Sequence, residues 1–162
     1  MAKTDAYSFS FQGCDNTAIK LADFKGKVIM VVNTASFCGF TPQYRALQEL
    51  HEQYYEQGLR VIAVPSRDFR KQEFSQIEKV VEFARDKFAI TFPITKISTV
   101  KGNNAHAFYL WANQQAGWLG SPKWNFHKYV IDKQGDFVTW FSSLTKPNSP
   151  KVINLIEQQL AN

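Results

Sequence analysis

The spacing of hydrophobic and polar residues predicts a chain of alternating strands and helices. Residues 7–21 alternate apolar with polar side chains around a polar turn, which predicts an N-terminal β-hairpin. Residues 28–32 and 59–64 are continuous apolar runs, typical of strands buried on both faces of a sheet. Apolar residues within 44–54 recur at helical spacing between these two runs. This strand–helix–strand unit predicts two parallel strands joined by a right-handed crossover.

Local capping signals predict where the first two helices begin and end. Thr41-Pro42 predicts an N-cap followed by proline at the first helical position, and Gly58 predicts the end of that helix. Ser75 and Glu78 have the spacing of a capping box, which predicts that a second helix begins there.

The C-terminal half predicts two more helices and a second hairpin. Residues 104–115 have a helical apolar face, and residues 116–124 are expected to form a long loop. Residues 129–131 and 137–141 flank a turn and predict two antiparallel strands. Ser149-Pro150 predicts the start of a C-terminal helix.

This order of elements predicts an α/β fold of thioredoxin-like topology, in which helices flank a central mixed sheet preceded by an N-terminal β-hairpin. One domain is expected to span residues 1–162. Function in open α/β sheets gathers at the carboxyl ends of the strands. The turn after residue 32 and the loop of residues 66–72 are therefore expected to open onto the same edge.

Composition narrows the possible functions. The net charge is +5, but the Lys and Arg residues are scattered, whereas a nucleic-acid-binding chain would gather them into a stripe. No apolar run reaches the roughly 18 residues of a membrane-spanning helix, and residues 1–7 lack the apolar core of a signal peptide. We therefore expect a cytoplasmic protein with no nucleic-acid partner and no membrane span.

Cys38 is the residue whose position most strongly suggests chemistry. It follows the first buried strand, precedes a predicted helix start and is flanked by Gly39. Unpaired backbone N–H groups and a helix dipole at such a place favour the thiolate, which is the reactive form. The other cysteine, Cys14, lies in a hairpin turn without activating context, so we interpret it as structural or incidental. Two cysteines argue against a disulfide framework and a structural zinc site.

The segment Trp124-Asn125 supplies two neutral hydrogen-bond donors before the third core strand. Aimed at a sulfur, an indole N–H and an amide would stabilise a thiolate; aimed at a peroxide oxygen, they would stabilise the departing anion. Taken alone, the segment is also compatible with a structural role, as a core tryptophan beside an asparagine-bearing turn.

Three segments together resemble the glutathione peroxidase family in its cysteine form: residues 33–41, 64–73 and 124–126. The resemblance extends from about residue 7 to residue 160. It implies a peroxidase of thioredoxin-like fold that reduces hydrogen peroxide or organic hydroperoxides. No bound cofactor or metal is implied, and glutathione or another thiol is the expected co-substrate.

The same resemblance implies roles for individual residues. Cys38 matches the peroxidatic residue, and Trp124 and Asn125 match two members of the family's catalytic tetrad. The fourth tetrad position, usually glutamine, holds Asp68. A carboxylate near the sulfur would oppose the thiolate because like charges disfavour each other.

Three arrangements around Asp68 remain open from the sequence. Arg67 or Arg70 offsets its charge, the carboxylate turns away from the sulfur, or Gln72 supplies the missing amide.

Two further departures bear on partners. Ala84 stands where thioredoxin-using members of the family carry a resolving cysteine, and Ser66 stands where many relatives carry another cysteine. The long oligomerisation loop of tetrameric relatives is missing between residues 99 and 108, which favours a monomer or a small homo-oligomer.

The sequence thus predicts a one-cysteine peroxidase that an external thiol recycles, with glutathione or thioredoxin as reductant. The alternative is a redox sensor or relay that passes oxidation from Cys38 to a partner protein. Turnover separates the two, because a sensor is oxidised once and recycled poorly.

Overall fold

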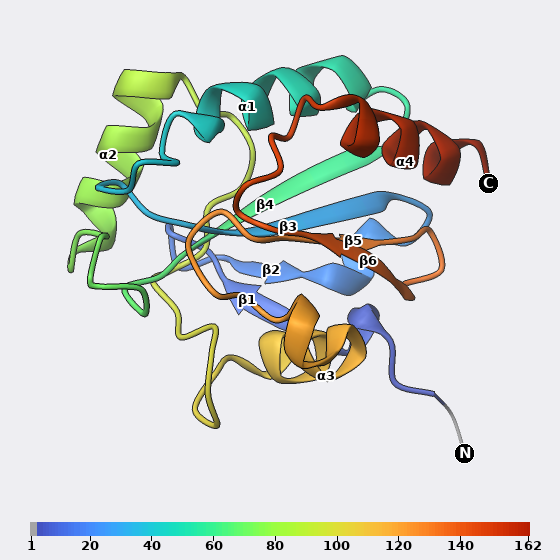
Figure 1. Ribbon diagram of the computed structural model, residues 1–162, viewed down its shortest axis with the longest axis horizontal. Coiled ribbons are helices and arrows are strands. Elements are labelled where there is room, and N and C mark those ends of the chain that lie inside the picture. Colours follow the sequence, from blue (N-terminus) through green and yellow to red (C-terminus); the bar gives the residue numbers. More distant parts are fainter. Residues whose placement is uncertain (1–2) are drawn as a thin grey trace.

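The computed structural model describes residues 3–162 and shows a central sheet with helices on both faces (Figure 1). Residues 1–2, which belong to the stretch expected to lack the apolar core of a signal peptide, lie outside the described part of the chain. The sheet has the strand order β4-β3-β5-β6. Its strands are β3 (Val28–Thr34), β4 (Leu59–Pro65), β5 (Lys128–Ile131) and β6 (Phe137–Phe141).

The strand pairing confirms the predicted mixed sheet. β3 and β4 are parallel, with Val31 opposite Ile62, whereas β5 pairs antiparallel with both β3 and β6. All seven residues of β3 are buried, as expected for a central strand covered on both faces. The predicted N-terminal hairpin forms a separate two-stranded sheet of β1 (Ser10–Gln12) and β2 (Ala18–Lys20).

Among residues 3–162, four α-helices cover the sheet. Their bounds are α1 (Gln43–Tyr54), α2 (Ile77–Phe88), α3 (Ala107–Gly120) and α4 (Pro150–Ala161), and two short 3-10 segments, η1 (Ala6–Ser8) and η2 (Leu21–Phe24), flank the hairpin. Figure 1 shows α1 and α4 over one face of the sheet and α3 with the hairpin below the other. Alternate residues of β3 serve the two faces. Met30 packs in the core under α1 and α4, and Val31 packs in the core that contains α3 and the hairpin.

The predicted helix cap at Thr41 is wrong. α1 begins at Gln43, and its N-cap position is Pro42, which has no side chain that can accept a capping hydrogen bond. The Thr41 hydroxyl is already engaged, because it accepts from the N–H of Cys38 and donates to the carbonyl of Ala35. Thr41 therefore closes the turn that carries the cysteine.

Two other local predictions also fail. Ser75 and Glu78 do not form a capping box, because the residue before α2 is Gln76 and no side chain bonds the first turn. The loop expected from residue 116 is largely helical, since α3 continues to Gly120 across a kink at Gly117. Gly117 has φ of 76°, a left-handed conformation that glycine adopts without strain, so the chain bends there and coils again.

Within residues 3–162 no helix is both long and apolar enough to cross a membrane.

Candidate active site

The turn that carries Cys38 lies at the carboxyl end of β3, between Thr34 and the start of α1. Thr41 closes it. Its hydroxyl lies 3.0 Å from the amide nitrogen of Cys38 and 2.8 Å from the carbonyl oxygen of Ala35. Cys38 is only 8% exposed. It precedes the first residue of α1 by five positions, so turn N–H groups, rather than the first helical turn, are the backbone donors nearest to it.

Two neutral donors reach the sulfur of Cys38. The indole Nε1–H of Trp124 lies 3.2 Å from Sγ, and the backbone N–H of Phe40 lies 3.3 Å from it. Hydrogen bonds donated to a sulfur favour its anionic form, and neither donor brings a competing charge. The arrangement therefore suits a nucleophilic thiolate.

Trp124 is positioned by the same strand that positions Cys38. The side-chain Nδ2 of Asn33, near the end of β3, donates to the carbonyl of Trp124 at 3.0 Å. The indole also packs against Phe69, with ring centroids 6.0 Å apart. Strand β3 thus fixes both partners of the sulfur–indole hydrogen bond.

Within residues 3–162, Asn125 makes no hydrogen bond to the sulfur of Cys38 and instead bonds Gln72. It is fully buried, and its Nδ2 donates to Oε1 of Gln72 at 3.1 Å. The backbone carbonyl of Gln72 accepts from the N–H of Phe37 at 2.9 Å. Asn125 and Gln72 therefore link the loop after β4 to the turn that holds Cys38.

The carboxylate of Asp68 is turned away from the sulfur. Its Oδ2 accepts from the backbone N–H groups of Val100 and Lys101, at 2.6 and 3.2 Å. Neither Arg67 nor Arg70 pairs with it, because Lys3–Asp136 is the one ion pair found within residues 3–162. Of the arrangements left open by the sequence, the structure has Asp68 turned away; within residues 3–162 Gln72 makes no hydrogen bond to the sulfur, and its Oε1 accepts from Asn125.

Sequence reasoning missed two residues of this centre, Ser36 and Glu73. Their side chains form a buried hydrogen bond of 2.5 Å directly beside the cysteine turn. Burial raises the pKa of Glu73 to about 7. A glutamate in a polar loop is normally exposed, so nothing in the local sequence signals this burial.

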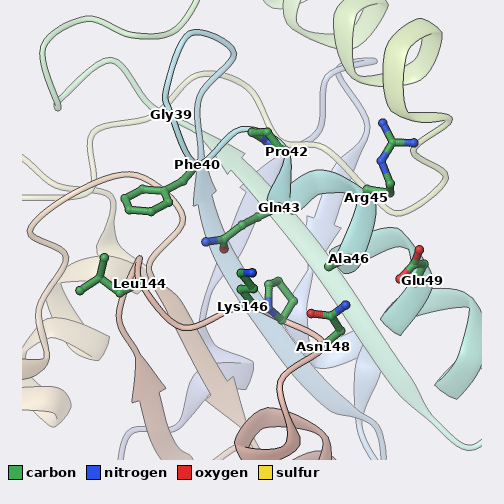
Figure 2. Close-up of a pocket in the computed structure, with 11 residues that line it drawn as sticks. Gly39, Phe40, Pro42, Gln43, Arg45, Ala46, Glu49, Leu144, Lys146 and Asn148 are labelled. Carbon is green, nitrogen blue, oxygen red and sulfur yellow. The ribbon is translucent and has the colours of Figure 1, made fainter.

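Two cavities adjoin the turn and share Phe40 and Leu144 in their walls. The larger, of about 420 Å³, is a groove between α1 and the segment before α4 (Figure 2). The smaller, of about 250 Å³, lies against Trp124 and includes Leu119. Leu119 and Leu144 are 73% and 77% exposed, so the rim of this site is apolar and open to solvent.

Buried polar side chains hold the walls of the smaller cavity. Lys128 donates to the carbonyls of Ser142 and Thr145, and burial lowers the pKa of Lys128 to about 7. Burial lowers the pKa of His127 to about 4, so its ring is neutral at pH 7 and its Nε2 can donate to the carbonyl of Gly120. The chain segments that carry the exposed leucines are thus tied to Lys128, the first residue of β5, and to His127 directly before it.

The fold and this site define a thiol peroxidase of thioredoxin-like architecture, and comparison with known proteins supports this class. The family model described as glutathione peroxidase matches residues 6–113. Glutathione peroxidase-like peroxiredoxin 2 of Saccharomyces cerevisiae is 42% identical over 149 residues, covering 90% of this chain and 92% of the yeast protein. Hydroperoxy fatty acid reductase gpx1 of Synechocystis is 35% identical over 155 residues, covering 91% and 92% of the two chains.

Solved structures give the same result for the fold. The crystal structure of Trgpx in its apo form superposes with a TM-score of 0.80 at 29% identity and covers 99% of this chain and 98% of its own. A DsbE-type thiol:disulfide interchange protein from Chlorobium tepidum, at 17% identity, shares the fold with a TM-score of 0.68 and 99% coverage of both chains. The predicted thioredoxin-like topology is confirmed.

The chain belongs to the glutathione peroxidase family. It is a thiol-dependent peroxidase that reduces peroxides, as the resemblance of its sequence motifs implied. With two cysteines and no selenocysteine in its sequence, it is a cysteine-containing member.

Asp68→Asn tests the orientation of the Asp68 carboxylate. Because this group bonds the backbone of residues 100–101 and not the sulfur, the pH profile of Cys38 alkylation should stay unchanged. The free energy of unfolding should fall by about 1–2 kcal/mol, since hydrogen bonds to a charged acceptor are weakened. Asp86→Asn, at an exposed aspartate of α2, is the matched control. An alkylation profile displaced to lower pH would show that the Asp68 carboxylate does act on the sulfur.

Proposed function

We propose that Cys38 is the peroxidatic residue of this peroxidase. The observation that carries the proposal is the pair of neutral donors, Trp124 Nε1–H and Phe40 N–H, within 3.3 Å of its sulfur. The Cys38 thiolate attacks one oxygen of the peroxide, an S–O bond forms and the O–O bond breaks. The departing oxygen takes up the proton that the thiol released and leaves as water or an alcohol. Cys38 is left as a sulfenic acid.

The surrounding residues divide into two proposed roles. Trp124 stabilises the thiolate and, as charge leaves the sulfur, the departing oxygen. Asn125 and Gln72 hold the turn in register through their mutual hydrogen bond and the Phe37–Gln72 backbone bond. Asp68, at the position where the family usually has glutamine, anchors its loop to residues 100–101 and takes no direct part in the chemistry.

Regeneration is proposed to come from outside the chain. Ala84, at the position of the expected resolving cysteine, is fully buried in α2, and Cys14 lies in the β1–β2 turn against the same helix. An external thiol attacks the sulfenic sulfur, releases water and leaves a mixed disulfide. A second thiol then displaces Cys38 and forms the external disulfide.

Glutathione is the reductant that the larger groove supports best. Figure 2 shows Arg45 and Glu49 along α1 and Lys146 opposite, with the Arg45 side chain directed towards α2, where its guanidinium lies 5.5 Å from the ring of Phe88. Glutathione carries two carboxylates and one ammonium group, so Lys146 and Glu49 supply one group of each complementary charge along the groove. The Nε2 of Gln43 donates to the carbonyl of Ser143 at 2.7 Å, so this buried side chain joins the two walls of the groove. Thioredoxin is the alternative donor.

An organic hydroperoxide with an apolar chain is the peroxide that the rim supports best. Leu119 and Leu144 expose apolar surface beside Trp124, and exposed apolar patches of this kind mark binding surfaces. The related Synechocystis protein is named hydroperoxy fatty acid reductase, which fits the same substrate class. Hydrogen peroxide needs only the polar centre and would be reduced as well.

A cytoplasmic location and a monomer or small homo-oligomer complete the proposal. Both cysteines are free thiols, which suits a reducing compartment.

Steady-state peroxide reduction by the Cys38→Ser and Cys14→Ser variants tests the nucleophile and the reductant together. Cys38→Ser should lower activity more than about 100-fold, because a hydroxyl is a far weaker nucleophile than a thiolate. Cys14→Ser should retain wild-type activity with glutathione as the donor. Each protein is assayed with glutathione and, separately, with thioredoxin and its reductase.

Two outcomes would contradict this proposal. Full activity in Cys38→Ser would remove Cys38 as the nucleophile. Turnover with thioredoxin alone, lost in Cys14→Ser, would identify Cys14 as a resolving cysteine and exclude glutathione as the reductant.

Leu144→Gln tests the apolar rim. Loss of one apolar contact should lower kcat/KM for a long-chain hydroperoxide by about tenfold, as expected for roughly 1.5 kcal/mol of apolar burial. The value for hydrogen peroxide should stay within about twofold of wild type. Leu110→Gln, at another exposed leucine, on α3 and outside both cavities, is the matched control. Equal losses for both peroxides would contradict a chain-binding role.

A further inference from the structure

Glu73 is a buried carboxyl group with no cationic partner. It is 2% exposed, and no Lys, Arg or His nitrogen within residues 3–162 lies within ion-pair distance of its carboxylate. Arg67 comes near, but its Nε–H donates to the backbone carbonyl of Glu73 and not to the side chain. An unpaired charge is costly to bury, so this environment favours the neutral acid.

The carboxyl group of Glu73 holds the turn that carries Cys38. Its Oε1 lies 2.5 Å from Oγ of Ser36, two residues before the cysteine, and accepts from the N–H of Phe74 at 3.0 Å. The preceding residue, Gln72, accepts from Phe37 N–H through its backbone. Two consecutive residues of the loop, Gln72 and Glu73, are thus hydrogen-bonded to two consecutive residues of the turn, Phe37 and Ser36.

The second oxygen of Glu73, Oε2, is buried without a protein hydrogen-bond partner among residues 3–162, and so are the hydroxyls of Tyr44 on α1 and Thr34 on β3. Burial raises the pKa of Tyr44, and the charge of Glu73 adds to the increase. The groups around the carboxyl are therefore neutral ones, apart from Arg67 at its backbone and the thiol of Cys38 beyond Ser36.

We propose that Glu73 is a positioning residue of the Cys38 centre, which holds the turn as a neutral acid so that the thiolate is the one buried negative charge there. This proposal rests on the proposed role of Cys38. Glu73 is thereby given a role although it is not one of the two donors, Trp124 and Phe40, that hydrogen-bond the sulfur.

The proposal has a consequence for pH. Burial raises the pKa of Glu73 to about 7, so the carboxyl group ionises between pH 6 and 8. Above pH 7 its negative charge opposes the thiolate of Cys38. The pKa of Glu73 is higher in the folded chain than in the unfolded chain. The neutral carboxyl group therefore contributes fully to the stability of the fold below pH 4.5, and this contribution is lost as the pH rises through 7.

Alkylation of Cys38 in a Cys14→Ser background, followed from pH 5 to 9, tests the proposal without requiring peroxidase turnover. Glu73→Gln keeps the shape and the acceptor oxygen but cannot ionise. Its alkylation rate should match wild type at pH 6 and exceed it by about threefold at pH 8. The melting temperature of Glu73→Gln relative to that of the wild type should rise by about 5 °C between pH 5 and 8, because the buried His127 and Lys128 titrate alike in both proteins and only Glu73 differs.

Glu56→Gln, at an exposed glutamate after α1, is the matched control and should follow the wild type. Ser36→Ala gives a second test. The Ser36 hydrogen bond lowers the pKa of Glu73, so its loss should raise that pKa. The break in the alkylation profile, which is the pH at which ionisation of Glu73 begins to slow alkylation of Cys38, should then move to higher pH. The proposal would be overturned if the ratio of the Glu73→Gln alkylation rate to the wild-type rate were the same at pH 6 and pH 8. It would also be overturned if the break stayed at the same pH in Ser36→Ala. Failure of Cys38 as the peroxidatic residue would instead appear as turnover in Cys38→Ser.

Discussion

The candidate active site depends on the carboxyl end of β3. This strand is buried along its whole length between β4 and β5, so the segments that follow β3 and β4 and precede β5 meet at one edge of the sheet. Asn33 joins them, because its side chain donates to the carbonyl of Trp124 and its own carbonyl accepts from Phe126 N–H at 2.6 Å. Phe126 has φ of 64°, an uncommon conformation for a residue with a side chain, and this hydrogen bond helps to hold it. The 3.2 Å contact between indole and sulfur follows from this anchoring.

Within residues 3–162, neither acidic side chain of the site, Asp68 or Glu73, pairs with a cation or hydrogen-bonds the sulfur of Cys38. Asp68 turns its carboxylate to the backbone of residues 100–101, and Glu73 is buried without a cation. Trp124, Asn125 and Gln72 are neutral. A thiolate at Cys38 would thus sit among neutral dipoles, which stabilise it by hydrogen bonds and leave it free to react.

Much of this arrangement could be predicted from the sequence because it follows from strand burial. The apolar runs of β3 and β4 predicted a parallel pair of strands. The position of Cys38 after β3 predicted that the cysteine lies at the edge of the sheet where these two strands end. The details that failed or stayed open are those in which a polar group has several possible partners. Thr41 could cap α1 or close the turn, and Asp68 could face the sulfur or residues 100–101; contacts between distant segments decide both. The burial of Glu73 gave no sequence signal, because a loop glutamate is expected to be exposed.

Trapping of the sulfenic acid is the most direct measurement of the central claim, that one cysteine carries the oxidation. The reduced protein is treated with one equivalent of peroxide in the presence of a sulfenic-acid-specific nucleophile and then digested for mass spectrometry. The expected result is about one adduct per chain, on Cys38, with Cys14 remaining a free thiol. An adduct on Cys14, or a disulfide between Cys14 and Cys38, would contradict it.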